Sequence, residues 1–97
     1  MVAYLVATLE IKDLESFKPY IAKVPAIVEH YGGRFLVRGG ELELLEGEWP
    51  FRRVTVIEFP SLEQARKWWD SSEYAEYRAI RGSAARTNAV FVQGLSA

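Results

Sequence analysis

Three strand-like segments of this chain carry apolar side chains on both of their faces, and this feature limits the possible folds more than any other. The segments span residues 2–10, 52–59 and 87–93. In the last of them, Val90 and Val92 point to one face, whereas Phe91 points to the other. Strands of this kind are buried on both sides of a sheet. The fold must therefore supply a cover for each face.

The segment after the first strand has the residue spacing of a helix. Asp13 is a favourable N-cap for this helix, and apolar residues recur every three or four positions up to Gly32-Gly33, which ends it. Pro19 and Pro25 each lack a backbone N–H group. We therefore expect this helix to kink or to break into pieces.

A second helix is predicted after residue 60. Ser61 and Gln64 form the signature of a capping box at its start. Residues 70–72 interrupt this helix, and Ser72 can cap a further helical segment that begins at Glu73. The second helix is therefore predicted to be divided.

Two strands are predicted between the helices, at residues 34–38 and 52–59. Gly39-Gly40 marks a bend or bulge, after which residues 41–46 continue the first of these strands. The turn at residues 47–50 then leads into the second strand.

The predicted order of elements is β-α-β-β-α-β. With right-handed crossovers, this order gives an α+β, ferredoxin-like fold: one four-stranded antiparallel sheet with the helices on one face. The 97 residues suit one domain that spans residues 1–97. Because the helices cover only one face, the apolar side chains of the other predict a homodimer, with Val90, Phe91 or Val92 near the contact.

The composition excludes several classes of function. The chain has no cysteine, so cysteine-ligated metal sites and thiolate catalysis are excluded, and we expect no bound cofactor. The net charge of −1 argues against a nucleic-acid partner. No stretch approaches the roughly 20 apolar residues of a membrane span, and the N-terminus lacks the features of a signal peptide. We therefore expect a cytoplasmic protein without a membrane partner.

A series of short motifs runs through the chain from Tyr4 to Gly94. They are Tyr31-Gly32-Gly33, Arg38-Gly39-Gly40, Leu45-Glu46-Gly47 with Trp49, Glu58-Phe59-Pro60-Ser61, and Trp69 with Ser72-Glu73-Tyr74. Together they resemble the family of the domain of unknown function 1330 (DUF1330), in the dimeric α/β-barrel superfamily. The resemblance implies a ferredoxin-like protomer whose sheet packs on the sheet of its mate. It implies no activity, because that superfamily includes monooxygenases, isomerases, haem-binding enzymes and stress-response proteins.

His30 is the single histidine and a first candidate for chemistry. It precedes the Gly32-Gly33 stop, where an imidazole can interact with the last carbonyls of the helix. That structural role is the simpler interpretation. The functional alternative is a general base or a haem ligand.

Arg38 and Glu58 are a second candidate, because they lie on neighbouring predicted strands. Counting back from the turn at residues 47–50 places Glu58 close to position 39, so the two charges are expected to meet. Either they form a structural ion pair at the edge of the sheet, or they face a polar pocket that binds the acid or carbonyl group of a substrate.

A third candidate is one face of the divided second helix. Tyr74, Tyr77, Arg78 and Arg81 have the spacing i, i+3, i+4 and i+7. With Trp69, such a face can bind an aromatic or carboxylated ligand. In the alternative interpretation, the tyrosines pack on the sheet and the arginines extend along them to solvent.

Two functional hypotheses remain open on the sequence alone. The first is an enzyme or binding protein that needs no cofactor and takes a small carboxylated or aromatic molecule in a cleft between sheet and helices. The second is a non-catalytic dimeric module in regulation or stress response. A polar cleft beside Arg38 or Arg81 favours the first, and a cleft filled by the protein's own aromatic side chains favours the second.

Overall fold

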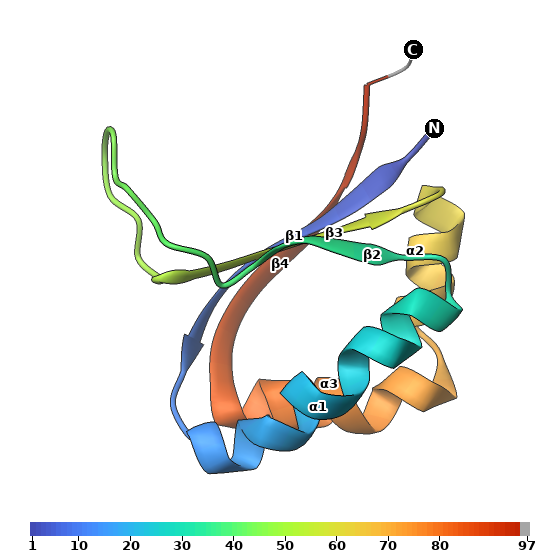
Figure 1. Cartoon of the computed structure of the whole chain (residues 1–97), viewed down its shortest axis with the longest axis horizontal. Helices are drawn as coiled ribbons and strands as arrows, with labels where there is room; N and C mark the ends of the chain where they lie inside the picture. Colours follow the sequence, from blue (N-terminus) through green and yellow to red (C-terminus); the bar gives the residue numbers. More distant parts are fainter. Residues whose placement is uncertain (96–97) are drawn as a thin grey trace.

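A computed structural model describes residues 1–95 and contains a single four-stranded antiparallel sheet with helices on one side of it (Figure 1). The elements are β1 (Ala3–Ile11), α1 (Leu14–His30), β2 (Arg34–Arg38), β3 (Arg53–Phe59), α2 (Leu62–Trp69), α3 (Ser72–Ala84) and β4 (Ala85–Gln93). The strands lie in the order β2-β3-β1-β4. The predicted α+β, ferredoxin-like fold is therefore confirmed. No helix within residues 1–95 is long and apolar enough to cross a membrane.

Strand β1 runs through the middle of the sheet and organises the core. Its alternate residues, Leu5 and Ala7 among them, are buried beneath the helices. The largest side chains that are wholly buried against this face include Trp68 and Tyr74, and both come from the divided second helix. The core thus lies between the sheet and the helices, as expected for strands that alternate in this way.

The helices begin at caps that the sequence encodes. The Asp13 carboxylate accepts a hydrogen bond from the Ser16 amide at 3.2 Å, and the two hydrogen bonds from Ser16 lower the pKa of Asp13. Ser61 accepts from the Gln64 amide at 3.0 Å, as predicted. The third helix is capped by Ser71, not by the expected Ser72, since the Ser71 hydroxyl accepts from the Tyr74 amide.

Helix α1 runs through Pro19 and Pro25 as one helix of 17 residues, so the expected break into pieces is wrong, whereas the expected kink stays a prediction. Each proline removes one backbone hydrogen bond. The apolar face of α1, which buries Phe17, Val24 and Val28, offsets that loss by packing on the sheet.

The segment between β2 and β3 is a second correction. Residues 41–46 form no strand, and Figure 1 shows this segment extending away from the sheet as a long arm. The physical reason lies at Gly39, which has a φ of +66° and turns the chain out of the sheet. Strand pairing therefore ends at this glycine and not at the turn at residues 47–50.

The face of the sheet away from the helices remains uncovered in the single chain. Val90 and Val92 of β4 point to this face, and these residues are 56% and 47% exposed. The neighbouring Val6 and Val56 are half-buried. This confirms the expectation that the helices cover only one face and leave apolar side chains on the other.

Candidate functional site

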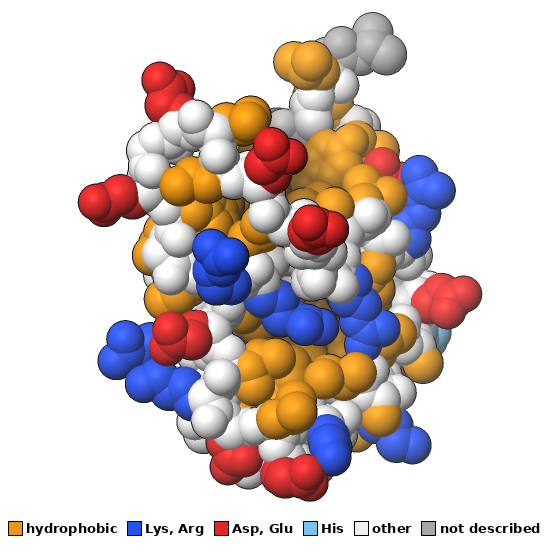
Figure 2. Space-filling view, turned by 60° about the vertical axis from the view of Figure 1, so that its left-hand side comes forward, with side chains coloured by type: hydrophobic (Ala, Val, Ile, Leu, Met, Phe, Trp, Pro, Cys, Tyr) orange, Lys and Arg blue, Asp and Glu red, His pale blue; other side chains and the backbone are white. Residues whose placement is uncertain are grey.

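A small cavity lies between the sheet and helix α1. Its volume is about 30 Å³, which is room for one or two water molecules. Most of its wall is apolar, but the wall also contains one tyrosine and three arginines from different elements: Tyr20 of α1, Arg38 of β2, Arg53 of β3 and Arg81 of α3. On the face of the molecule shown in Figure 2, basic side chains gather over a recess that contains hydrophobic side chains. The cavity is thus a place where positive charge meets apolar surface.

Arg81 is the most deeply placed of these arginines. It is only 8% exposed, and its Nε atom has no hydrogen-bond partner among the described residues. Its guanidinium lies over the ring of Trp69, with Cζ 4.9 Å from the ring centroid. A buried guanidinium without a full set of acceptors is costly. An anion in the cavity would supply the missing acceptor.

Arg38 and Arg53 lie where β2 and β3 leave the sheet for the arm. Arg38 donates from Nη2 to the carbonyl oxygen of Ile21 at 2.7 Å. Arg53 packs on Gly39 so closely that a Cβ atom at that position would lie 2.6 Å from its Cζ atom. None of the ion pairs within residues 1–95 involves Arg38, Arg53 or Arg81. All three are therefore available to an external anion.

Tyr20 was missed by the sequence analysis. Its hydroxyl lies 2.6 Å from that of Tyr74, and its ring stacks on Phe17. Burial raises the pKa of both tyrosines, so both are neutral near physiological pH. The available signal was the spacing of Phe17, Tyr20 and Val24 on one helical stripe, which places a polar tip on a buried face.

The predicted pairing of Arg38 with Glu58 does not form. Arg38 lies opposite Thr55, whereas Glu58 lies opposite Arg34 and accepts a hydrogen bond from its Nε atom at 3.1 Å. Ile57 lines the cavity, and Glu58, the next residue of the strand, points to the opposite face of the sheet. The error came from counting the register back from the turn at residues 47–50, which lies beyond the paired residues.

The remaining predicted residues lie outside the cavity lining. Tyr74 is wholly buried in the core, where its hydroxyl contacts that of Tyr20, and Tyr77 packs against the core cluster. Trp69 lies beneath Arg81 and Arg78. Its neighbour Trp68 is wholly buried in the core.

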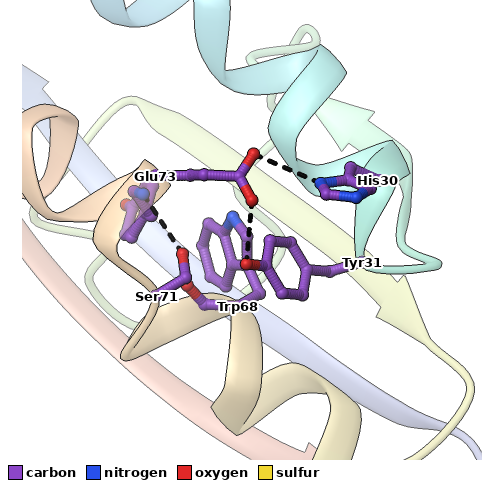
Figure 3. A network of polar contacts seen from close by, with 6 residues as sticks. His30, Tyr31, Trp68, Ser71 and Glu73 are labelled. Carbon is purple, nitrogen blue, oxygen red and sulfur yellow. Dashed lines mark hydrogen bonds and ion pairs between the residues drawn. The ribbon is translucent and has the colours of Figure 1, made fainter.

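His30 lies outside the cavity lining and belongs to a surface network (Figure 3). The Glu73 carboxylate accepts from the Tyr31 hydroxyl at 3.0 Å and lies 3.2 Å from His30 Nδ1. Beside it, Ser71 donates to the carbonyl oxygen of Trp68. The network joins the end of α1 to the start of α3. No three side chains of the metal-binding types lie together within residues 1–95.

Comparison with known families gives the same architecture. The profile of a domain of unknown function, DUF1330, matches residues 2–95. The chain belongs to the DUF1330 family. None of the curated proteins matches it.

Solved structures share the fold of this DUF1330 chain. RPA0582, a protein of unknown function from Rhodopseudomonas palustris, is 16% identical with a TM-score of 0.78, over 99% of this chain and 84% of that one. SnoaB, a cofactor-independent oxygenase from Streptomyces nogalater, is 9% identical with a TM-score of 0.62, over 99% of this chain and 95% of that one. At these identities, the similarity establishes a shared fold.

Proposed function

We propose that this protein is a homodimer that binds a small carboxylated molecule with an apolar or aromatic body in the cavity between the sheet and helix α1. One observation carries the proposal: Arg38, Arg53 and Arg81 reach an apolar cavity without a carboxylate of their own. A ligand carboxylate would pair with a guanidinium through two parallel hydrogen bonds, which is the strongest arrangement for such a pair.

The small size of the cavity sets a condition on the entry of a ligand. At about 30 Å³ it accepts little more than water, so the body of a ligand must displace side chains at the mouth. Arg38 is held by a hydrogen bond to one backbone carbonyl and by contact with the ring of Phe35. A ligand carboxylate is a stronger acceptor than that carbonyl. Binding is therefore expected to move Arg38 and to widen the cavity.

Isothermal titration with benzoate tests this proposal, with benzyl alcohol as the uncharged comparison. We expect saturable binding of benzoate and none of benzyl alcohol. Arg38→Met should weaken benzoate binding about 10-fold or more, because a hydrogen bond to a charged group contributes roughly 1.5–3 kcal/mol. Arg86→Met, outside the cavity lining, is the matched control. Failure of benzoate to bind, or equal effects of the two substitutions, would reject the proposal.

A second candidate function is oxygenation of the bound molecule without a cofactor. The specific observation in its favour is that Tyr20 and Arg81 place hydrogen-bond donors in an apolar cavity, where such donors stabilise the oxyanion of an enolate. Oxygen uptake with 2-naphthol-3-carboxylate tests it. Oxygen uptake by the wild type that is lost in Arg81→Met would support an oxygenase. Binding of benzoate without any oxygen uptake would instead support a binding protein.

The homodimer rests on the uncovered face of the sheet. A standard specific interface buries about 800 Å² on each partner, and this face offers a row of valines from three adjacent strands, among them Val6, Val56 and Val90. A sheet packed on its mate would remove these side chains from water.

Sedimentation at micromolar concentration tests the homodimer. We expect the wild type to sediment as a dimer of 11.1 kDa protomers and Val90→Glu as a monomer. Leu14→Glu is the control, because Leu14 is equally exposed but lies at the start of α1, where a negative charge is favourable. If the wild type sediments as a monomer, the homodimer is wrong. The binding proposal would not be affected, because the titration with benzoate tests it separately.

A further inference from the structure

We infer that Tyr20 and Arg81 form a two-donor clamp that selects a carboxylate over an isosteric neutral group, and that Tyr74 positions the Tyr20 hydroxyl for this task. This inference rests on the proposed binding function and specifies the recognition step within the same cavity. It concerns Tyr20 and Tyr74, whose hydroxyls contact each other between the cavity and the core.

The direction of the Tyr20–Tyr74 hydrogen bond follows from burial. Either hydroxyl can be the donor at 2.6 Å. Tyr74 is wholly buried. Among the described residues, its hydroxyl forms a hydrogen bond with the Tyr20 hydroxyl. If Tyr20 donated to Tyr74, the Tyr74 proton would be buried without an acceptor, at a cost of about 1–3 kcal/mol. Tyr74 therefore donates, and the Tyr20 proton remains free for a molecule in the cavity.

The surroundings of Tyr20 keep it a donor. Burial raises its pKa, and the hydrogen bond with Tyr74, together with the nearby guanidinium groups of Arg81 and Arg38, only partly opposes that rise. Its ring is fixed by stacking on Phe17, with ring centroids 4.9 Å apart. Tyr20 thus presents an O–H group in a fixed position and is not a base.

Arg81 supplies the second donor. Its Nε–H group has no acceptor within the described part of the chain, although the side chain is more than nine-tenths buried. The residues that line the cavity therefore carry an unused O–H and an unused N–H, and none of them is a carboxylate. The Arg81 Nε atom is fully buried, so a ligand that widens the cavity must uncover it. A ligand satisfies both donors only if it presents two acceptor oxygens. A carboxylate does so, whereas a primary amide turns its NH₂ group toward one of the donors.

The experiment compares benzoate with benzamide, which has the same shape and no charge. The measured quantity is the ratio of the two dissociation constants in the wild type, Tyr20→Phe, Tyr74→Phe and Tyr77→Phe. Tyr77 lies on the same helix as Tyr74 and also outside the cavity lining, but the hydrogen bond to Tyr20 is made by Tyr74, so Tyr77→Phe is the matched control. Thermal unfolding of each variant confirms that it is folded before the titration.

Tyr20→Phe should weaken benzoate binding about 10- to 100-fold, as expected for the loss of a hydrogen bond to a charged group, and should leave benzamide binding nearly unchanged. Tyr74→Phe should lower the benzoate/benzamide preference several-fold, because the Tyr20 hydroxyl is then free to rotate. A role for Tyr74 in stability alone would not change that ratio. The NMR signal of Arg81 Nε–H should shift on addition of benzoate in the wild type.

Two results would overturn the clamp. One is benzoate binding to Tyr20→Phe with the affinity and preference of the wild type. The other is an Arg81 Nε–H signal that benzoate leaves unmoved. Both leave the proposed binding function intact, because they require that benzoate binds. Failure of wild-type binding rejects the binding function itself, so the two failures are distinguishable.

Discussion

The two ends of the space between the sheet and the helices are built differently. At one end, Phe59, Trp68 and Tyr74 are wholly buried, and the Trp68 and Tyr74 ring centroids lie 4.2 Å apart. At the other end, Arg38 and Arg81 reach a cavity whose donors are only partly satisfied. We call these the aromatic end and the arginine end.

The two ends differ in charge. At the aromatic end the Trp68 Nε1 atom has no hydrogen-bond partner among the described residues, but close packing of uncharged aromatic rings stabilises the fold. Buried guanidinium groups without acceptors destabilise it, and natural proteins retain such groups mainly at functional sites. The Tyr20–Tyr74 hydrogen bond connects the two ends, with one hydroxyl in each. Substitutions at the two ends should therefore change different properties.

The largest effect is expected at the aromatic end. Trp68→Ala should lower the free energy of unfolding by about 3–5 kcal/mol, because it leaves a large cavity in a closely packed cluster. Trp49→Ala is the control, since Trp49 lies half-exposed on the arm, and it should change stability by about 0.5 kcal/mol or less. Urea denaturation measures both. Equal losses would show that the aromatic end is not the main source of stability.

The next largest effect is expected at the arginine end. Gly39→Ala should destabilise the protein by about 1–3 kcal/mol, because Gly39 has a positive φ and an added Cβ would collide with Arg53. It should also weaken benzoate binding, since Arg53 must move. Gly40→Ala meets no atom within 4 Å and should be nearly neutral in both assays. If both variants bind benzoate as the wild type does, Arg53 has no part in recognition.

Most of the fold could be predicted from the sequence because its signals are local. Alternation in the strands, the caps at Asp13 and Ser61, and the break before the third helix each depend on neighbouring residues. The failures were of another kind. The break at Pro19 and Pro25 was overridden by packing of α1 on the sheet, and the strand at residues 41–46 was lost to the turn at Gly39. Tertiary packing and the conformation of one glycine decided these cases.

The candidate site was less accessible to sequence reasoning. Arg38 and Arg81 could be proposed from their residue type and position, and the structure brings both to one cavity. The pairing of Glu58 was wrong because the register was counted back from the turn at residues 47–50, whereas pairing ends near Gly39 and the register of β2 shifts between Phe35 and Val37. Tyr20 was missed because its role depends on Tyr74, which is 54 residues away in the chain. Spacing within one helix cannot reveal a partner at that separation.

A smaller effect is expected on the pH dependence of stability, which tests the hydrogen-bonded tyrosine pair that connects the two ends. Burial raises the pKa of Tyr20 and Tyr74 above their ordinary value of 10.0. Above pH 10 the unfolded chain therefore releases protons that the folded protein keeps, so stability should fall as pH rises. Each tyrosine contributes up to about 1.4 kcal/mol per pH unit.

Tyr74→Phe should make this decline shallower, because one of the two tyrosines then no longer titrates. Denaturation curves between pH 9 and 11.5 measure the slope for the wild type and for the variant. An identical slope would show that the hydroxyl pair does not control the alkaline unfolding.

The smallest effect is expected at the surface network beside the aromatic end. His30→Gln removes the contact between His30 and Glu73, and because both side chains are exposed, the stability should change by about 0.5 kcal/mol or less. That small change should shrink further in 0.5 M salt, which screens exposed charges. Tyr31→Phe removes the other partner of Glu73 without changing charge, so any effect of it should persist in salt. A loss above about 2 kcal/mol for His30→Gln in denaturation experiments would mean that the network supports the packing of Trp68 and Tyr74, and that the aromatic end depends on polar contacts after all.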